Sequence, residues 1–183
     1  MTNKVMLQHM DIYQYPKTTM QSLGVVTLGD LHGNAVKLLH FLMLHGVVIW
    51  KASVVDRAGA YQSFVQIYER AAEILKFRAL MTQFVDPKQG ISNPEEYARL
   101  KSLSAPKELM ILLRQFNDLI SQLAVQEVDT HVRLLGDELA DRGSNDYFTL
   151  RLLGLLYDAH VAVSILSSNH GVQFLKNYEE GSS

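Results

Sequence analysis

The chain has 183 residues, the size of one ordinary domain and long enough to bury a substantial core. Hydrophobic residues make up 48% of it and charged residues 20%, a balance that excludes wholesale disorder. The net charge of −2 predicts no general attraction to nucleic acid or anionic membranes, and the absence of cysteine excludes disulfides, thiolate metal sites and cysteine nucleophiles.

The first predicted elements form a strand, a helix and a second strand. Residues Leu23 to Leu28 are a short apolar run that ends at Gly29-Asp30, which indicates a buried strand. Asn34 is a suitable N-cap for a helix over Ala35 to His45, with Gly46 as its C-terminal stop. Val47 to Trp50 is compatible with a second short strand.

Residues 51–130, called here the helical block, have a different pattern. Apolar residues recur at helical spacing from Tyr61 onward until Asp86-Pro87 interrupts them. Asn93-Pro94 then supplies an N-cap and a proline at the first helical position, and Pro106 opens a further helix. The pattern predicts a helical hairpin or small bundle inserted into another fold.

The strand, loop and helix order returns after the block. His131 to Leu135 indicates a strand that ends at Gly136-Asp137, and Asn145 to Asp158 indicates a helix. Val161 to Leu166 indicates another strand, and Val172 to Tyr178 would begin a last helix. Outside the helical block, short strands and helices therefore follow one another along the chain, and we expect an α/β fold.

Three of the predicted strands end in residues of metal-ligand type. The segments are Gly29-Asp30-Leu31-His32, Gly136-Asp137-Glu138 and Ser168-Asn169-His170. In an open parallel sheet ligands bind beyond the carboxyl ends of the strands, so neighbouring strands would bring these side chains to one crevice. Carboxylate, imidazole and amide groups together suit Mn²⁺, Fe²⁺ or Zn²⁺. Each segment alone also fits an ordinary turn, but their joint occurrence favours a metal-centred site.

These motifs resemble the calcineurin-like metallophosphoesterase superfamily, whose signature runs GDxH, GDxx and GNH[ED], followed by two histidine motifs. The Asp141-Arg142-Gly143 segment resembles the phosphoprotein phosphatase branch, and a helical insertion on such a core also resembles the Wip-type effector phosphatases of intracellular bacteria. The resemblance implies that residues 1–183 form a single incomplete phosphatase domain. Its fold would be the N-terminal half of a metallophosphoesterase β-sandwich, with the order βαβαβ and residues 51–130 as an insertion.

The resemblance also implies a role for each motif residue and a pair of divalent ions, Mn, Fe or Zn, in the full-length protein. Asp30 and His32 would bind the first ion, Asp137 would bridge both, and Asn169 would bind the second. His170 would protonate the leaving oxygen and would be held by Asp141, while Arg142 would grip the phosphate. The implied reaction is in-line attack on a phosphomonoester by a hydroxide that bridges the metals.

Three features depart from the family pattern. The second motif, GDELADRG, is one residue longer than the family's GDxxDRG, so the family pattern does not fix the positions of Asp141 and Arg142. The third motif, around Asn169 and His170, lacks the family's preceding glycine and following acidic residue. No histidine follows His170, so two ligands of the second ion are missing, and this chain would bind one ion or none. The remaining histidines are not expected to replace them: His9, His40, His45, His131 and His160.

Three functions remain open on these grounds. The first is a metal-dependent phosphoprotein phosphatase of which this chain is an N-terminal fragment. The second is a catalytically degenerate phosphatase-fold module that binds a partner protein through its helical block, and the third is a metallophosphoesterase acting on nucleotides. No membrane span, secretory leader or nucleic-acid partner is expected. We expect a cytoplasmic protein, secreted into a host cell if it is a bacterial effector, that self-associates through the sheet face left bare by the missing half.

Overall fold

A computed structural model describes residues 10–20, 24–86, 90–126, 129–136, 139, 145–166, 172 and 176. Its elements follow in the order β1 (Gly24–Gly29), α1 (Ala35–Leu44), β2 (Val48–Trp50), α2 (Arg57–Thr82), β3 (Val85–Asp86), β4 (Gly90–Ile91), α3 (Pro94–Leu103), α4 (Pro106–Ser121), β5 (Leu123–Val125), β6 (Thr130–Leu135), α5 (Asp146–Asp158) and β7 (Val163–Ile165). The structure therefore confirms the expected α/β class, a mixture of strands and helices. Most of the last expected helix, Val172 to Tyr178, lies outside the described residues.

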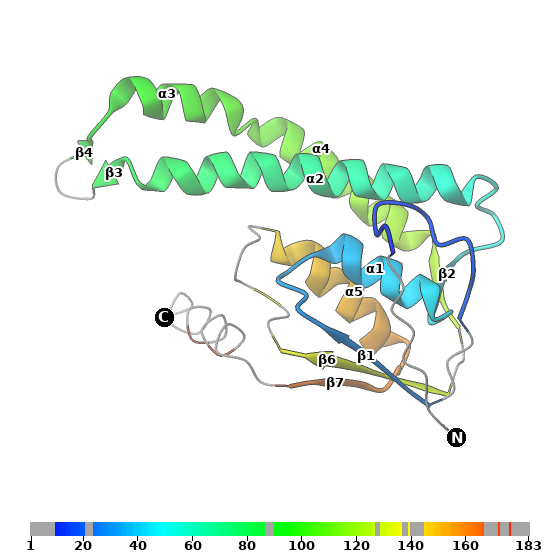
Figure 1. Cartoon of the computed structure of the whole chain (residues 1–183). Coiled ribbons are helices and arrows are strands. Elements are labelled where there is room, and N and C mark those ends of the chain that lie inside the picture. The colour runs from blue at the N-terminus through cyan, green and yellow to red at the C-terminus, as the bar shows by residue number, and fades with distance from the viewer. Residues whose placement is uncertain are drawn as a thin grey trace.

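The principal sheet has three parallel strands in the order β1-β6-β7. Helices α1 and α5 lie over one face of this sheet, as Figure 1 shows. The strand residues that face these helices, Val26, Val132 and Leu134, are buried. They share one core with the apolar faces of α1 and α5, which contribute Leu38, Leu39 and Leu152 among others. The alternation of buried and exposed residues along β6 is that of a sheet with one covered face.

The helical block forms an arm that lies across the outer side of α1 and α5 (Figure 1). Its long helix α2 packs against α3 and α4, and the short hairpin β3–β4 connects α2 to α3. Phe116 of α4 joins the arm to the remainder of the protein, because its ring lies 5.5 Å from that of Phe64 in α2 and 4.0 Å from that of Phe148 in α5. The arm therefore shares the hydrophobic core of the α/β unit.

Two helix starts predicted from the sequence are confirmed by their hydrogen bonds. The Asn34 side chain accepts a hydrogen bond from the amide of Lys37 at 2.9 Å, and that of Asn93 accepts one from the amide of Glu96 at 3.1 Å. Each bond satisfies an amide that the first turn of a helix leaves without a backbone partner. Helix α2 begins at Arg57, earlier than the apolar spacing indicated, because Asp56 caps it through the amide of Gly59.

Strand β2 is present but does not belong to the principal sheet. It pairs antiparallel with β5, a strand that the sequence did not predict. The two strands meet because β2 precedes α2 and β5 follows α4, which are antiparallel neighbours in the arm. The βαβαβ sandwich remains a prediction.

The second face of the principal sheet carries partly exposed apolar side chains. Val25 is 51% exposed and Leu135 is 47% exposed. Within the described residues no helix or strand covers this face in Figure 1. None of the described helices has the length and apolar character needed to cross a bilayer.

Candidate metal centre

The three strands that precede the predicted motifs end at the same edge of the principal sheet. Gly29 of β1 is in register with Leu135 of β6, and Leu134 of β6 is in register with Ile165 of β7. All three strands are parallel, so the chain leaves each of them on the same side. The sequence argument required this adjacency, and the structure confirms it for the strands.

Asp30 and His32 lie together in the loop that follows β1. A hydrogen bond joins Nε2 of His32 to Oδ1 of Asp30. The Asp30 side chain is 80% exposed, whereas that of His32 is 15% exposed. A carboxylate oxygen and an imidazole nitrogen at such close range form a donor pair that suits Zn²⁺, Mn²⁺ or Fe²⁺, so the two residues fit one metal ion.

Both residues have an unusual backbone conformation. The φ angle is 53° at Asp30 and 48° at His32, in the left-handed region that L residues rarely enter. Such a conformation costs on the order of 1–3 kcal/mol and persists only where surrounding contacts impose it. Strained backbone of this kind clusters at functional sites, which supports a role for the loop.

Side chains from three helices fix this loop. The Lys37 ammonium of α1 donates to the carbonyl oxygens of Gly29 at 2.9 Å and Asp30 at 2.6 Å. The carbonyl oxygen of Gly33 accepts hydrogen bonds from Thr149 of α5 at 2.9 Å and from Tyr68 of α2 at 3.2 Å. Burial raises the pKa of Tyr68 to about 12, with smaller contributions from Tyr13 and Asp146, so its hydroxyl keeps its proton at neutral pH.

The other predicted site residues lie outside the described residues: Asp137, Asp141, Arg142, Asn169 and His170. The neighbour of Asp137 in the chain, Gly136, is described and has a φ of 71° directly after β6. Within the described ranges, no cluster of three or more His, Cys, Asp or Glu side chains could hold a metal ion. Asp30 and His32 are therefore the part of the predicted site whose geometry is known, and the ligand roles remain predictions.

The histidines considered as replacement ligands lie elsewhere. His40 and His45 belong to α1 and its C-cap, and burial lowers the pKa of both. His131 is near the start of β6, where its Nε2 is 2.7 Å from the hydroxyl of Ser164, and His160 precedes β7. His131 and His160 are thus at the opposite end of the sheet from Asp30, as expected. His9 lies outside the described residues.

Comparison with known proteins gives a match to a family model and matches among solved structures. Residues 131–183 match the family model described as WipA-like, phosphatase domain. The chain is also similar to the crystal structure of the phosphatase domain from the Legionella effector WipB, with 30% sequence identity and a TM-score of 0.54. A search of curated proteins gave no match.

The family match and the WipB match cover different parts of the chain. The structural match covers 87% of this chain but only 43% of the WipB domain, so the chain spans less than half of that domain. The family match begins at the second residue of β6 and contains Asp137, Asp141, Arg142, Asn169 and His170. Over these extents, the chain is similar to WipA-like phosphatase domains and to the phosphatase domain of the effector WipB.

Proposed function

We propose that this protein is a metal-dependent phosphatase that hydrolyses phosphomonoesters of phosphoproteins, and that it acts as a bacterial effector. The observation that carries the proposal is the Asp30–His32 donor pair at the carboxyl edge of a parallel sheet, next to the strand end that leads into Asp137. The similarity to WipA-like and WipB phosphatase domains supports the phosphatase part of the proposal.

In this proposal each motif residue has one task. Asp30, His32, Asp137 and Asn169 hold divalent ions, which when bound supply an activated water and neutralise charge on the phosphoryl oxygens. Arg142 orients the phosphate by donating paired hydrogen bonds to its oxygens. His170 delivers a proton to the leaving oxygen of the substrate, and Asp141 holds its imidazole.

The first experiment is Mn²⁺-dependent hydrolysis of p-nitrophenyl phosphate by the chain and by Asp137→Asn. Removing the carboxylate shared by both ions should lower the rate by about 100-fold or more. Asp129→Asn is the matched control, because Asp129 is exposed and precedes the same strand at its opposite end. Wild-type turnover in Asp137→Asn would refute the site assignment.

If the chain shows no turnover, a second measurement tests whether it binds metal at the first site. Isothermal titration with Mn²⁺ should show binding to the wild type and to Asp129→Asn, with a large loss of affinity in Asp30→Asn. Equal Mn²⁺ affinity in the wild type and Asp30→Asn would rule out the first metal site. If this chain binds Mn²⁺ and a C-terminally longer chain hydrolyses p-nitrophenyl phosphate, the site in this chain is incomplete. If the longer chain shows no hydrolysis, the site is degenerate.

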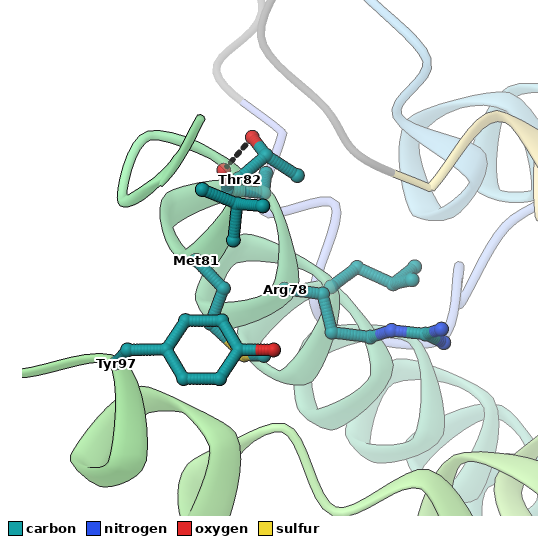
Figure 2. Close-up of a pocket in the computed structure, with 7 residues that line it drawn as sticks. Arg78, Met81, Thr82 and Tyr97 are labelled. Atoms are coloured by element: carbon teal, nitrogen blue, oxygen red, sulfur yellow. Dashed lines mark hydrogen bonds between the residues drawn. The ribbon is translucent and has the colours of Figure 1, made fainter. Parts of the chain in front are cut away.

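The alternative function, a module that binds a partner protein through the arm, is favoured by one feature. An open cavity of about 640 Å³ lies between the end of α2 and the start of α3, and its lining is mostly apolar (Figure 2). Arg78, Met81, Thr82 and Tyr97 line it, and Arg78 forms no ion pair with any described residue. Mn²⁺-dependent hydrolysis that is lost in Asp137→Asn would exclude the hypothesis of a catalytically degenerate module. The cavity would then have at most an accessory role.

A further inference from the structure

The loop that carries Asp30 and His32 is bounded by three carbonyl groups that side chains hold in place. Lys37 holds the carbonyls of Gly29 and Asp30, on the N-terminal side of the ligand pair. The carbonyl of Gly33 directly follows His32 and accepts two hydroxyl donors. Asn34 closes the loop, since its amide donates to the carbonyl of Leu31 at 2.9 Å.

One of the two hydroxyl donors comes from the arm. Tyr68 belongs to α2, and the Asn145 amide group donates to its carbonyl oxygen at 3.3 Å. Its ring lies edge-on to that of Phe148, with the centroids 5.6 Å apart. Tyr68 is therefore held by contacts around α5 while its hydroxyl reaches the loop, and the arm has a direct connection to the candidate metal centre.

We propose that Tyr68 and Thr149, together with Lys37, are positioning residues that keep Asp30 and His32 in the strained conformation required for metal binding. The proposal rests on the metal-dependent function above and assigns the helical block a part in it. The backbone has a positive φ at both Asp30 and His32, and these three side chains supply hydrogen bonds on both sides of the pair that hold it there. Partners that orient metal ligands in this way typically change metal affinity about 10- to 100-fold when they are removed.

The test compares two tyrosines of the same helix. Tyr68→Phe removes the hydroxyl that bonds the Gly33 carbonyl, and Tyr61→Phe removes one that bonds the Ile12 carbonyl at 2.6 Å, away from the loop. Both substitutions keep the ring and delete one partly buried hydrogen bond between α2 and a backbone carbonyl. The double variant Tyr68→Phe with Thr149→Val leaves the Gly33 carbonyl without either donor.

Two readouts on the intact chain are needed. Hydrogen–deuterium exchange of the metal-free protein should be at least about 3-fold faster for the peptide covering residues 30–37 in Tyr68→Phe and faster again in the double variant, with no change in Tyr61→Phe. The Mn²⁺ dissociation constant, measured by titration calorimetry, should rise about 10-fold in Tyr68→Phe and remain within about 2-fold of wild type in Tyr61→Phe.

The two measurements distinguish failure of the positioning role from failure of the proposed metal-dependent function. Unchanged exchange at residues 30–37 in the double variant would overturn the positioning role whether or not metal binds. Faster exchange with an unchanged Mn²⁺ dissociation constant would show that the held conformation is irrelevant to metal binding, which also overturns it. Absence of Mn²⁺ binding in the wild type would count against the proposed function instead, while the exchange data would still decide whether these residues fix the loop.

Discussion

Gly33 occupies the most restricted position in the loop between β1 and α1. Its φ of +69° is one that side chains rarely adopt, and an added Cβ would lie 2.7 Å from the carboxylate of Asp146. Gly33→Ala should therefore destabilise the fold by about 1–2 kcal/mol or more, since both backbone strain and a steric clash oppose it. The measurement is the free energy of unfolding from urea denaturation.

Gly154 in α5 provides the control for that substitution. Nothing lies within 4 Å of the Cβ that alanine would add there, and the residue is inside a regular helix. Gly154→Ala should stabilise the protein by roughly 0.5–1 kcal/mol, because alanine has the higher helix propensity. Equal effects of the two substitutions would contradict the special role of the Gly33 backbone.

At the level of elements, an ion pair fastens α2 to α4. Nε of Arg70 donates to one carboxylate oxygen of Glu108 at 2.6 Å, and a second guanidinium nitrogen donates to the other oxygen at 2.9 Å. The hydrogen bonds from Arg70 lower the pKa of Glu108 below its usual 4.5. A carboxyl whose pKa is lowered by folding adds stability above its unfolded pKa and loses it as the pH falls through the folded value.

Glu108→Gln should therefore lower the Tm at pH 7, and the difference from wild type should shrink as the pH falls below about 4.5. Added salt should shrink it as well, because both side chains are partly exposed. Glu69→Gln on α2 is the control, since the described residues offer Glu69 no ion pair. A Tm difference independent of pH would indicate that the charge of Glu108 does not contribute.

The sequence predicted the helices of the structure better than its small strands. Capping by Asn34 and Asn93 is a local signal, so α1 and α3 could be placed closely. Strand β5 was missed because Leu123 continues the apolar spacing of α4, and β3 and β4 were missed because each has only two residues. The pairing of β2 with β5 depends on how the arm folds back, which no local pattern encodes.

The candidate site also has a part that the sequence predicts and a part that only the structure reveals. Asp30 and His32 were found from the sequence because they follow a strand directly. Their supports, Lys37, Tyr68 and Thr149, come from three helices, and only the folded chain brings them to one loop. In the sequence Lys37 is a polar residue within the apolar helix predicted over Ala35 to His45, and Tyr68 is one of several apolar residues at helical spacing in the helical block.

For the whole molecule, the central question is whether the arm folds with the α/β unit or separately from it. Phe116 is fully buried and contacts rings from both parts, so the two share one core. We therefore predict one cooperative unfolding transition. Far-UV circular dichroism, dominated by the helices, should give the same midpoint as the fluorescence of Trp50, the single tryptophan, which is buried in β2.

Substitution of Phe116 tests this coupling directly. Phe116→Ala should lower the free energy of unfolding by about 3–5 kcal/mol and should shift the circular dichroism and Trp50 transitions together. Ile111→Ala, on the exposed side of the same helix, should change it by only about 0.5 kcal/mol. Two separate transitions in the wild type would mean that the arm is an independent unit. In that case the hydrogen bond from Tyr68 to the Gly33 carbonyl could not couple arm stability to the loop between β1 and α1.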